Sequence, residues 1–325
     1  MTAYVIRRLM QSVVVVLIMS VIVFFGVNVV GDPVDMLINP EADQEDIEAA
    51  IRALGLDKPI GEQYLFFLKN AITGNLGKSF IFGEPALQLI IQRMPATLEL
   101  AITALLMAIF LGIPLGLYAG LKPDSPASRT IMAGSILGFS LPTFWVGLMM
   151  IMVFAVMLGW LPSTGRGETA TFLGITSSLF TLNGLQHIFM PALNLALLKI
   201  SLVIRLTRAG TREAIHQDYI KFARAKGLSP HRVIMVHLLK NILIPVVTVI
   251  GLEFGSLVAF SVVTETIFAW PGMGKLLIDS IQQLDRPVIV AYLIIIVLLF
   301  VTLNLIVDIL YSILDPRVRL GEREA

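Results

Sequence analysis

Residues that could perform chemistry are sparse in this chain of 325 residues, and no catalytic pattern joins them. None of the four histidines belongs to an H-E-x-x-H or paired-carboxylate arrangement: these are His187, His216, His231 and His237. Cysteine is absent, which excludes disulfides, zinc–thiolate sites and thiol nucleophiles. Residues 272–276 read G-M-G-K-L, which lacks the leading glycine and the final hydroxyl of a phosphate-binding loop. We therefore expect no catalytic site, no metal site and no cofactor bound by this chain.

Four ionisable residues fall within apolar stretches, where a charge costs about 2.5–3.5 kcal/mol and therefore suggests a function. Glu99 and Lys199 are expected near the ends of their stretches, from which side chains reach the interface, so a structural role is favoured. Glu253 stands in the middle of its stretch between glycines, and a pathway role and a structural hydrogen bond are equally open. Asp308 is expected to pair with a neighbouring helix or with the basic C-terminal tail.

A second candidate site is residues 265–274, whose composition suits a constrained re-entrant turn. Its notable members are a carboxylate, a tryptophan, a proline and two glycines: Glu265, Trp270, Pro271, Gly272 and Gly274. Such a turn would serve as a gate. For the tryptophan, the alternative is a place in the aromatic belt at the membrane interface, as for Trp145 and Trp160.

Segregated charge predicts the elements that position these residues. Hydrophobic residues make up 56% of the chain and charged residues 14%, against roughly a quarter charged in soluble proteins. Apolar stretches near the length that crosses about 30 Å of hydrocarbon occur at 9–30, 98–121, 131–158, 187–204, 242–263 and 288–313. The first exceeds a signal-peptide core and is interpreted as an uncleaved anchor. We expect an all-α integral membrane protein with about six transmembrane helices.

The distribution of Lys and Arg predicts the orientation of these spans. Basic residues gather before the first span, between the second and third, between the fourth and fifth, and in the C-terminal tail, so both termini are expected in the cytoplasm. The outward segments carry more acidic than basic residues. The largest of them, residues 31–96, is expected to be helical near 44–54 and 63–72. Residues 1–30 then form the N-terminus and first span, and residues 97–325 form the core.

The segment between the fourth and fifth spans, about residues 205–241, carries eight Lys and Arg residues. A strong helix signal runs over 213–226, Gly227 supplies a helix stop, and Ser229 followed by Pro230 suits the start of another helix. This pattern predicts a helix-turn-helix on the inner membrane surface. Ala223 and Ala225 would permit close packing with a partner protein, but the residues alone favour contact of the basic side chains with anionic lipid headgroups.

Residues 218–227 read D-Y-I-K-F-A-R-A-K-G, and residues 237–245 read H-L-L-K-N-I-L-I-P. They resemble the cytoplasmic loop of permeases of ATP-binding cassette (ABC) importers of the dipeptide, oligopeptide and nickel class. The glutamate and late proline of the general permease pattern are missing, whereas peptide-class members share the A-R-A-K-G form. Further resemblances follow in family order along nearly the whole chain, including G-N-L-G-K-S at 74–79, S-L-P-T-F-W at 140–145 and D-P-R-V-R at 315–319.

The resemblance implies a type I ABC importer permease fold in the bacterial inner membrane and the import of dipeptides or oligopeptides. It implies a second, homologous permease, two ATPase subunits that bind ATP and Mg, an extracytoplasmic solute-binding protein, surrounding lipid and no nucleic acid. It also implies that a coupling helix docks on the ATPase through Asp218, Tyr219, Lys221, Phe222, Ala223, Arg224, Ala225, Lys226 and Gly227.

Other functions remain open on the sequence. A nickel or glutathione importer of the same class would share these motifs. A secondary transporter would need no ATPase but would show inverted repeats and broken helices, neither of which is evident. A membrane anchor for a redox enzyme would need intramembrane histidines as haem ligands, and only His187 comes near.

Overall fold

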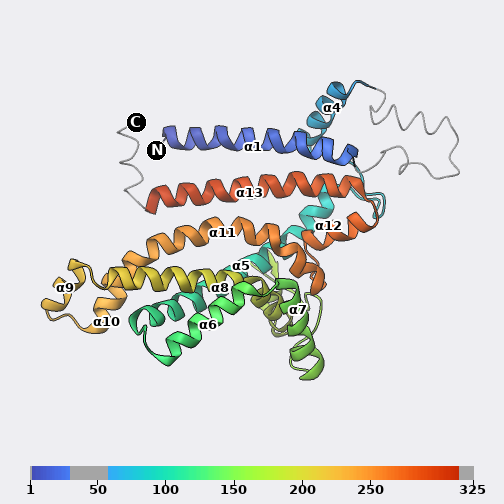
Figure 1. The fold of residues 1–325 in the computed structure, drawn as a ribbon. Helices are drawn as coiled ribbons and strands as arrows, with labels where there is room; N and C mark the ends of the chain where they lie inside the picture. The colour runs from blue at the N-terminus through green and yellow to red at the C-terminus, as the bar shows by residue number, and fades with distance from the viewer. Residues whose placement is uncertain (1, 30–57, 315–325) are drawn as a thin grey trace. The chain divides into compact units, whose positions relative to one another are not determined.

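The computed structural model describes residues 2–29 and 58–314, which are mostly helical (Figure 1). The chain divides into two units, each described here by itself. Of the described residues, one unit comprises 96–271 and 306–314, and the other comprises 2–29, 58–95 and 272–305. Helices α5 (Ala86–Leu121) and α13 (Arg286–Leu314) run from one unit into the other.

The unit that contains the N-terminus holds α1 (Thr2–Val29), α4 (Ile60–Ile72) and α12 (Met273–Gln282), with parts of α5 and α13. Helix α4 packs on the end of α1, where Phe24 contacts the rings of Tyr64 and Phe67 at 5.5 Å between centroids. The helix predicted at 63–72 is thereby confirmed. The one predicted at 44–54 lies outside the described residues.

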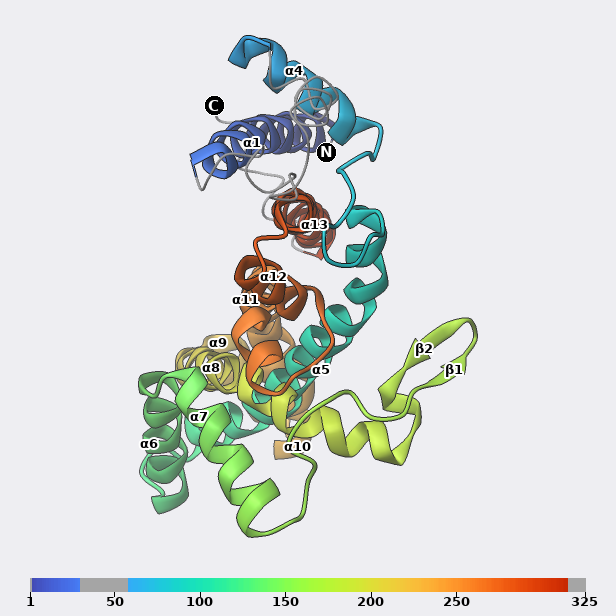
Figure 2. The ribbon, with the colours of Figure 1, turned by 90° about the vertical axis from the view of Figure 1, so that its right-hand side faces the viewer.

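The larger unit contains the remaining helices and one small sheet. In chain order its elements are α6 (Pro126–Ser140), α7 (Thr143–Met150) with a π-helical extension (Ile151–Met157), β1 (Ala170–Phe172), β2 (Ile175–Ser177), α8 (Leu182–Ala214), α9 (Asp218–Ala225), α10 (Pro230–Arg232), a second π-helix (Val233–Leu238) and α11 (Leu239–Ile267). Strands β1 and β2 form an antiparallel hairpin in which Ala170 faces Ser177. The hairpin projects as an arm (Figure 2).

Five described helices are long and apolar enough to cross a membrane, at residues 6–26, 86–121, 182–214, 230–267 and 286–307. A sixth crossing requires α6 and α7 with its extension, which meet at an angle of 108°. The apolar stretch predicted at 131–158 is thus divided between two helices. Its break falls at Leu141, whose extended backbone precedes Pro142, because a proline ring disfavours helical geometry in the preceding residue.

The second span also begins earlier than predicted, because α5 starts at Ala86 rather than near residue 98 and continues through Pro95. Along its C-terminal half, three glycines four residues apart face α8: Gly112, Gly116 and Gly120. A side-chain carbon built on Gly116 would lie 2.6 Å from the backbone oxygen of Ile204 and 2.7 Å from Cβ of Thr207. Only glycine permits this approach of the two helices. Sequence reasoning missed this stripe, although its G-x-x-x-G-x-x-x-G spacing is visible.

Candidate functional site

Helix α9, residues 218–225, is the central element of the predicted cytoplasmic site. It is separate from α8, because Gln217 has an extended backbone (φ −68°, ψ 150°) that interrupts the helix between Ala214 and Asp218. The single helix predicted over 213–226 is therefore wrong. Asp218 in the first turn favours a new helix start, since its charge complements the partial positive charge of the exposed backbone N–H groups.

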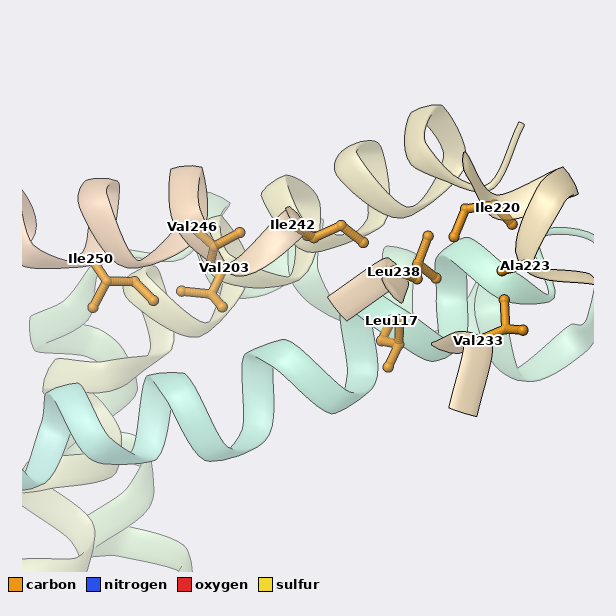
Figure 3. Close-up of a cluster of buried hydrophobic side chains, with 9 residues drawn as sticks. All are labelled: Leu117, Val203, Ile220, Ala223, Val233, Leu238, Ile242, Val246 and Ile250. Carbon is orange, nitrogen blue, oxygen red and sulfur yellow. The ribbon is translucent and has the colours of Figure 1, made fainter. Parts of the chain in front are cut away.

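One face of α9 is anchored in the protein's own core. Ile220 and Ala223 are buried in a hydrophobic cluster that includes Leu117 of α5, Leu238 and Ile242, and Figure 3 shows the apolar side chains of this cluster. Ala223 therefore packs within the chain rather than presenting a surface for a partner. The cluster joins α9 to the helices on both sides of it, so a displacement of α9 disturbs the packing of α5, α8 and α11.

The opposite face of α9 is exposed along its whole length. It carries two aromatic rings and several charges, and its residues are Tyr219, Lys221, Phe222, Arg224, Ala225 and Lys226. The Phe222 ring is 62% exposed, and Nζ of Lys226 lies 4.6 Å from its centroid. Lys221 donates a hydrogen bond of 2.9 Å to Asp218. Aromatic residues and arginine are enriched at protein interfaces, so Tyr219, Phe222 and Arg224 make this face suitable for a protein contact.

The turn after α9 confirms the predicted helix-turn-helix. Gly227 adopts φ +73°, which glycine reaches without steric cost, and its backbone N–H donates to the Arg224 carbonyl at 2.9 Å. Ser229 then caps α10 by accepting from the N–H of Arg232. The short π-helix 233–238 continues into α11, so the second arm of the pair is the start of a membrane span.

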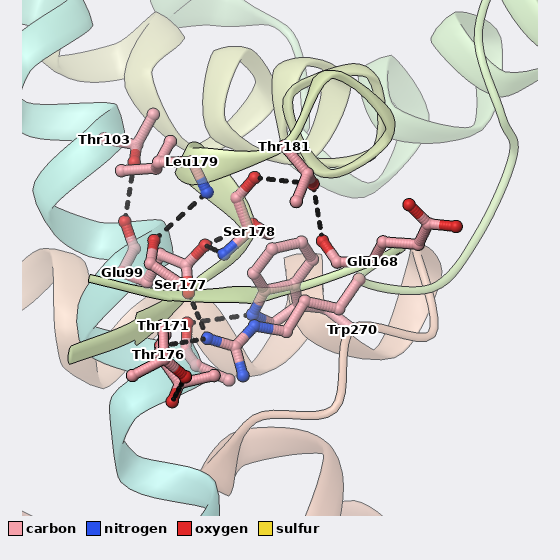
Figure 4. Close-up of polar contacts among 12 residues, drawn as sticks. Glu99, Thr103, Glu168, Thr171, Thr176, Ser177, Ser178, Leu179, Thr181 and Trp270 are labelled. Carbon is pink, nitrogen blue, oxygen red and sulfur yellow. Dashed lines mark hydrogen bonds and ion pairs between the residues drawn. The ribbon is translucent and has the colours of Figure 1, made fainter. Parts of the chain in front are cut away.

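A polar cluster in the same unit joins α5 to the loop that carries the hairpin (Figure 4). Glu99 is buried on α5 and accepts from the guanidinium of Arg166, from the backbone N–H of Ser178 at 2.9 Å, and from the Ser178 hydroxyl. The Arg166 guanidinium also lies 6.0 Å from the ring of Trp270. The partners of Glu99 therefore lie within the protein, whereas the sequence predicted that its side chain reaches the membrane interface.

The predicted gate residues lie partly in this region. Trp270 is fully buried and donates from Nε1 to the carbonyl of Ala96 at 2.9 Å, so its interpretation as part of an interfacial aromatic belt is wrong. Glu265, also fully buried, accepts from Thr97 at 2.7 Å and from Ser261 at 2.9 Å.

Around Trp270 the chain forms a tight turn between α11 and α12. Ala269 adopts φ +45°, and the N–H of Trp270 donates to the Glu265 carbonyl at 2.8 Å. Pro271 and Gly272 then lead directly into α12, in which Gly274 is the second residue. The re-entrant turn and the gate function both remain predictions.

The structure pairs two of the ionisable residues predicted within spans. Lys199 lies at the centre of α8, not near its end, and its ammonium contacts the carboxylate of Glu253 at the centre of α11. Lys199 also donates to the hydroxyl of Ser256 at 2.9 Å. Lys199 and Glu253 are 54 residues apart in the sequence. Patterns within a helix do not connect residues so far apart, so the pair was not predicted. Asp308 belongs to α13, but its side chain lies outside the described part of the structure.

The similarity to known proteins extends over nearly the whole chain. Residues 112–320 match the family described as binding-protein-dependent transport system inner membrane component, and residues 1–101 match the N-terminal region of such membrane components. The di/tripeptide transport system permease DppB of Pseudomonas aeruginosa is 40% identical, over 91% of this chain and 95% of its own. The oligopeptide permease AppB of Bacillus subtilis is 40% identical over 98% and 99%, respectively.

One further relative and one solved structure are also similar to this chain. The glutathione transport system permease GsiC of Escherichia coli is 38% identical over 98% of this chain and 99% of its own. An inward-facing structure of the MetNI methionine ABC transporter matches 71% of this chain and 99% of its own, with a TM-score of 0.56 and 18% identity. This last similarity supports the type I importer permease fold.

Proposed function

Because the chain belongs to the family of binding-protein-dependent transport system inner membrane components, we propose that it imports dipeptides or oligopeptides as one half of a permease pair. It is a multi-pass protein of the bacterial inner membrane and a permease subunit of an ABC importer. Relatives named for di/tripeptide and oligopeptide transport support the peptide substrate.

The observation that carries the coupling mechanism is the two-faced structure of α9. Its buried face, through Ile220 and Ala223, is continuous with the packing of three spans, while its other face presents Phe222 and basic side chains. An ATPase that binds the exposed face would move α9, and the buried face would transmit that movement into α8 and α11. The proposed partners are two such ATPase subunits holding ATP and Mg, a homologous permease and an extracytoplasmic binding protein.

Phe222→Glu tests this mechanism, because it places a negative charge on the proposed docking face without disturbing buried packing. We expect the amount of ATPase that co-purifies with the tagged variant to be at least tenfold lower than with the wild-type chain. Phe172→Glu is the matched control, since Phe172 on the hairpin is also 62% exposed. Equal loss in both variants, or in neither, would contradict docking through α9.

Glutathione is the second candidate substrate, because the glutathione transport system permease GsiC is 38% identical to this chain over 98% of its residues. Uptake of radiolabelled dialanine and of glutathione into proteoliposomes with the complete importer and its binding protein separates the two. ATP-dependent uptake of dialanine alone is the expected result, and uptake of glutathione alone would replace the peptide proposal.

A further inference from the structure

Lys199, Glu253 and Ser256 form a closed polar group midway along two apolar helices, here called the midspan cluster. Lys199 contacts the Glu253 carboxylate and donates to the Ser256 hydroxyl at 2.9 Å, and that hydroxyl lies 2.8 Å from the same carboxylate. The cluster is not fully enclosed by the chain, since the side chains of Lys199 and Glu253 are 19% and 32% exposed.

The exposed side of the cluster requires a polar environment. A charged group at this depth is costly to leave in hydrocarbon, so intramembrane charges face protein or a water-filled path. Gly251 lies close to Val307 of α13, where an added side-chain carbon would come within 2.9 Å. Glu253 follows Gly251 by two positions, which corresponds to about 200° of rotation around the helix axis. Glu253 therefore points away from Val307 and towards a different face of α11.

The cluster also spans the two helices that flank α9. Lys199 comes from α8, which precedes the cytoplasmic helix pair, and Glu253 and Ser256 come from α11, which follows it. Any movement that separates α8 from α11 lengthens the contact between the two charges. Separation leaves both charges uncompensated inside the membrane, which is unfavourable unless another molecule supplies opposite charges.

Resting on the peptide-import function proposed above, we propose that the midspan cluster is a binding subsite for the charged ends of the transported peptide. The peptide carboxylate pairs with Lys199, and the peptide ammonium pairs with Glu253 and Ser256. A peptide with both ends free replaces both members of the ion pair, whereas a peptide with blocked ends replaces neither. The subsite therefore favours zwitterionic peptides over their capped derivatives.

Cysteine accessibility tests this proposal directly, because the chain contains no cysteine of its own. Ser256→Cys changes one atom and keeps both charges, and Ile250→Cys, at a buried position of α11, is the matched control. The complete importer is reconstituted with its binding protein and treated with a cationic, water-soluble methanethiosulfonate. Labelling of this chain is then measured by mass spectrometry, with and without dialanine.

We expect labelling of Ser256→Cys but not of Ile250→Cys, and at least a threefold slower labelling when dialanine is present. N-acetyl-dialanine amide, which carries no charged end, should give no protection at the same concentration. Absence of labelling at Ser256→Cys, or equal protection by the capped peptide, would overturn the subsite. Failure of the wild-type importer to take up dialanine would instead refute the peptide function, and the subsite with it.

Discussion

Glu99 lies in an apolar helix, yet the contacts described for its carboxylate come from the protein. Arg166 supplies the opposite charge and Ser178 supplies two donors, so the carboxylate is paired as well as hydrogen-bonded. Removing one member of a buried ion pair leaves the other charge uncompensated. The sequence could indicate that Glu99 is structural, but its partner stands 67 positions away in a loop without a regular pattern.

Glu99→Ala should destabilise the protein by about 3 kcal/mol, the order expected when one partner of a buried pair is lost. The thermal unfolding midpoint of the detergent-purified chain measures this loss, which should amount to several degrees. Glu168→Ala removes an exposed carboxylate from the same loop and serves as the control. A variant of Glu99 that unfolds at the wild-type temperature would show that the pair contributes little.

Trp270 and Lys199 mark the limit of prediction at this scale. Composition places a tryptophan near an interface and a lysine near a helix end, because those are the average preferences of the residues. Both side chains instead lie where a specific partner is available, the Ala96 carbonyl for Trp270 and Glu253 for Lys199. Such partners arise from tertiary packing, which single-sequence patterns do not contain.

At the scale of elements, the contact between α5 and α8 depends on the absence of side chains. The glycine stripe lets the two helix backbones approach, and Thr207 and Thr211 of α8 are fully buried beside it. Close backbone approach through small residues is a main source of helix association in membranes.

Gly116→Leu should separate α5 from α8 and lower the yield of folded, monodisperse protein by at least fivefold in size-exclusion chromatography. Leucine also favours helix formation over glycine, so the loss cannot come from helix propensity. Gly134→Leu in α6 provides the control, because a side-chain carbon there meets nothing within 4 Å. Comparable yields of the two variants would mean that α5 and α8 tolerate a wider spacing.

Charge segregation predicts that most of these helices exist, because a stretch of about 20 apolar residues has few alternatives in a membrane. Charge segregation does not predict where these helices bend or break. The bend at Leu141, the break at Gln217 and the hairpin at 170–177 each depend on local backbone geometry or on contacts with distant segments. Helical periodicity carries little information about either.

At the scale of the whole molecule, the placement of Lys and Arg predicts which loops face the cytoplasm. Thr169 next to the hairpin should lie outside and His216 before α9 should lie inside, and both are exposed within the chain. A membrane-impermeant maleimide applied to intact spheroplasts should label Thr169→Cys but label His216→Cys only after permeabilisation. The reverse pattern would invert the orientation and remove α9 from reach of a cytoplasmic ATPase.

Helix α8 has 33 residues, which corresponds to about 50 Å at 1.5 Å per residue and exceeds a hydrocarbon thickness of about 30 Å. A tilt of about 10° around its middle would move each end by roughly 4 Å, given that length. Lys199 sits close to this pivot, so it would rotate while hardly changing its depth in the membrane. A tilt of α8 can thus turn a displacement of its end next to α9 into a rotation of Lys199 at its centre.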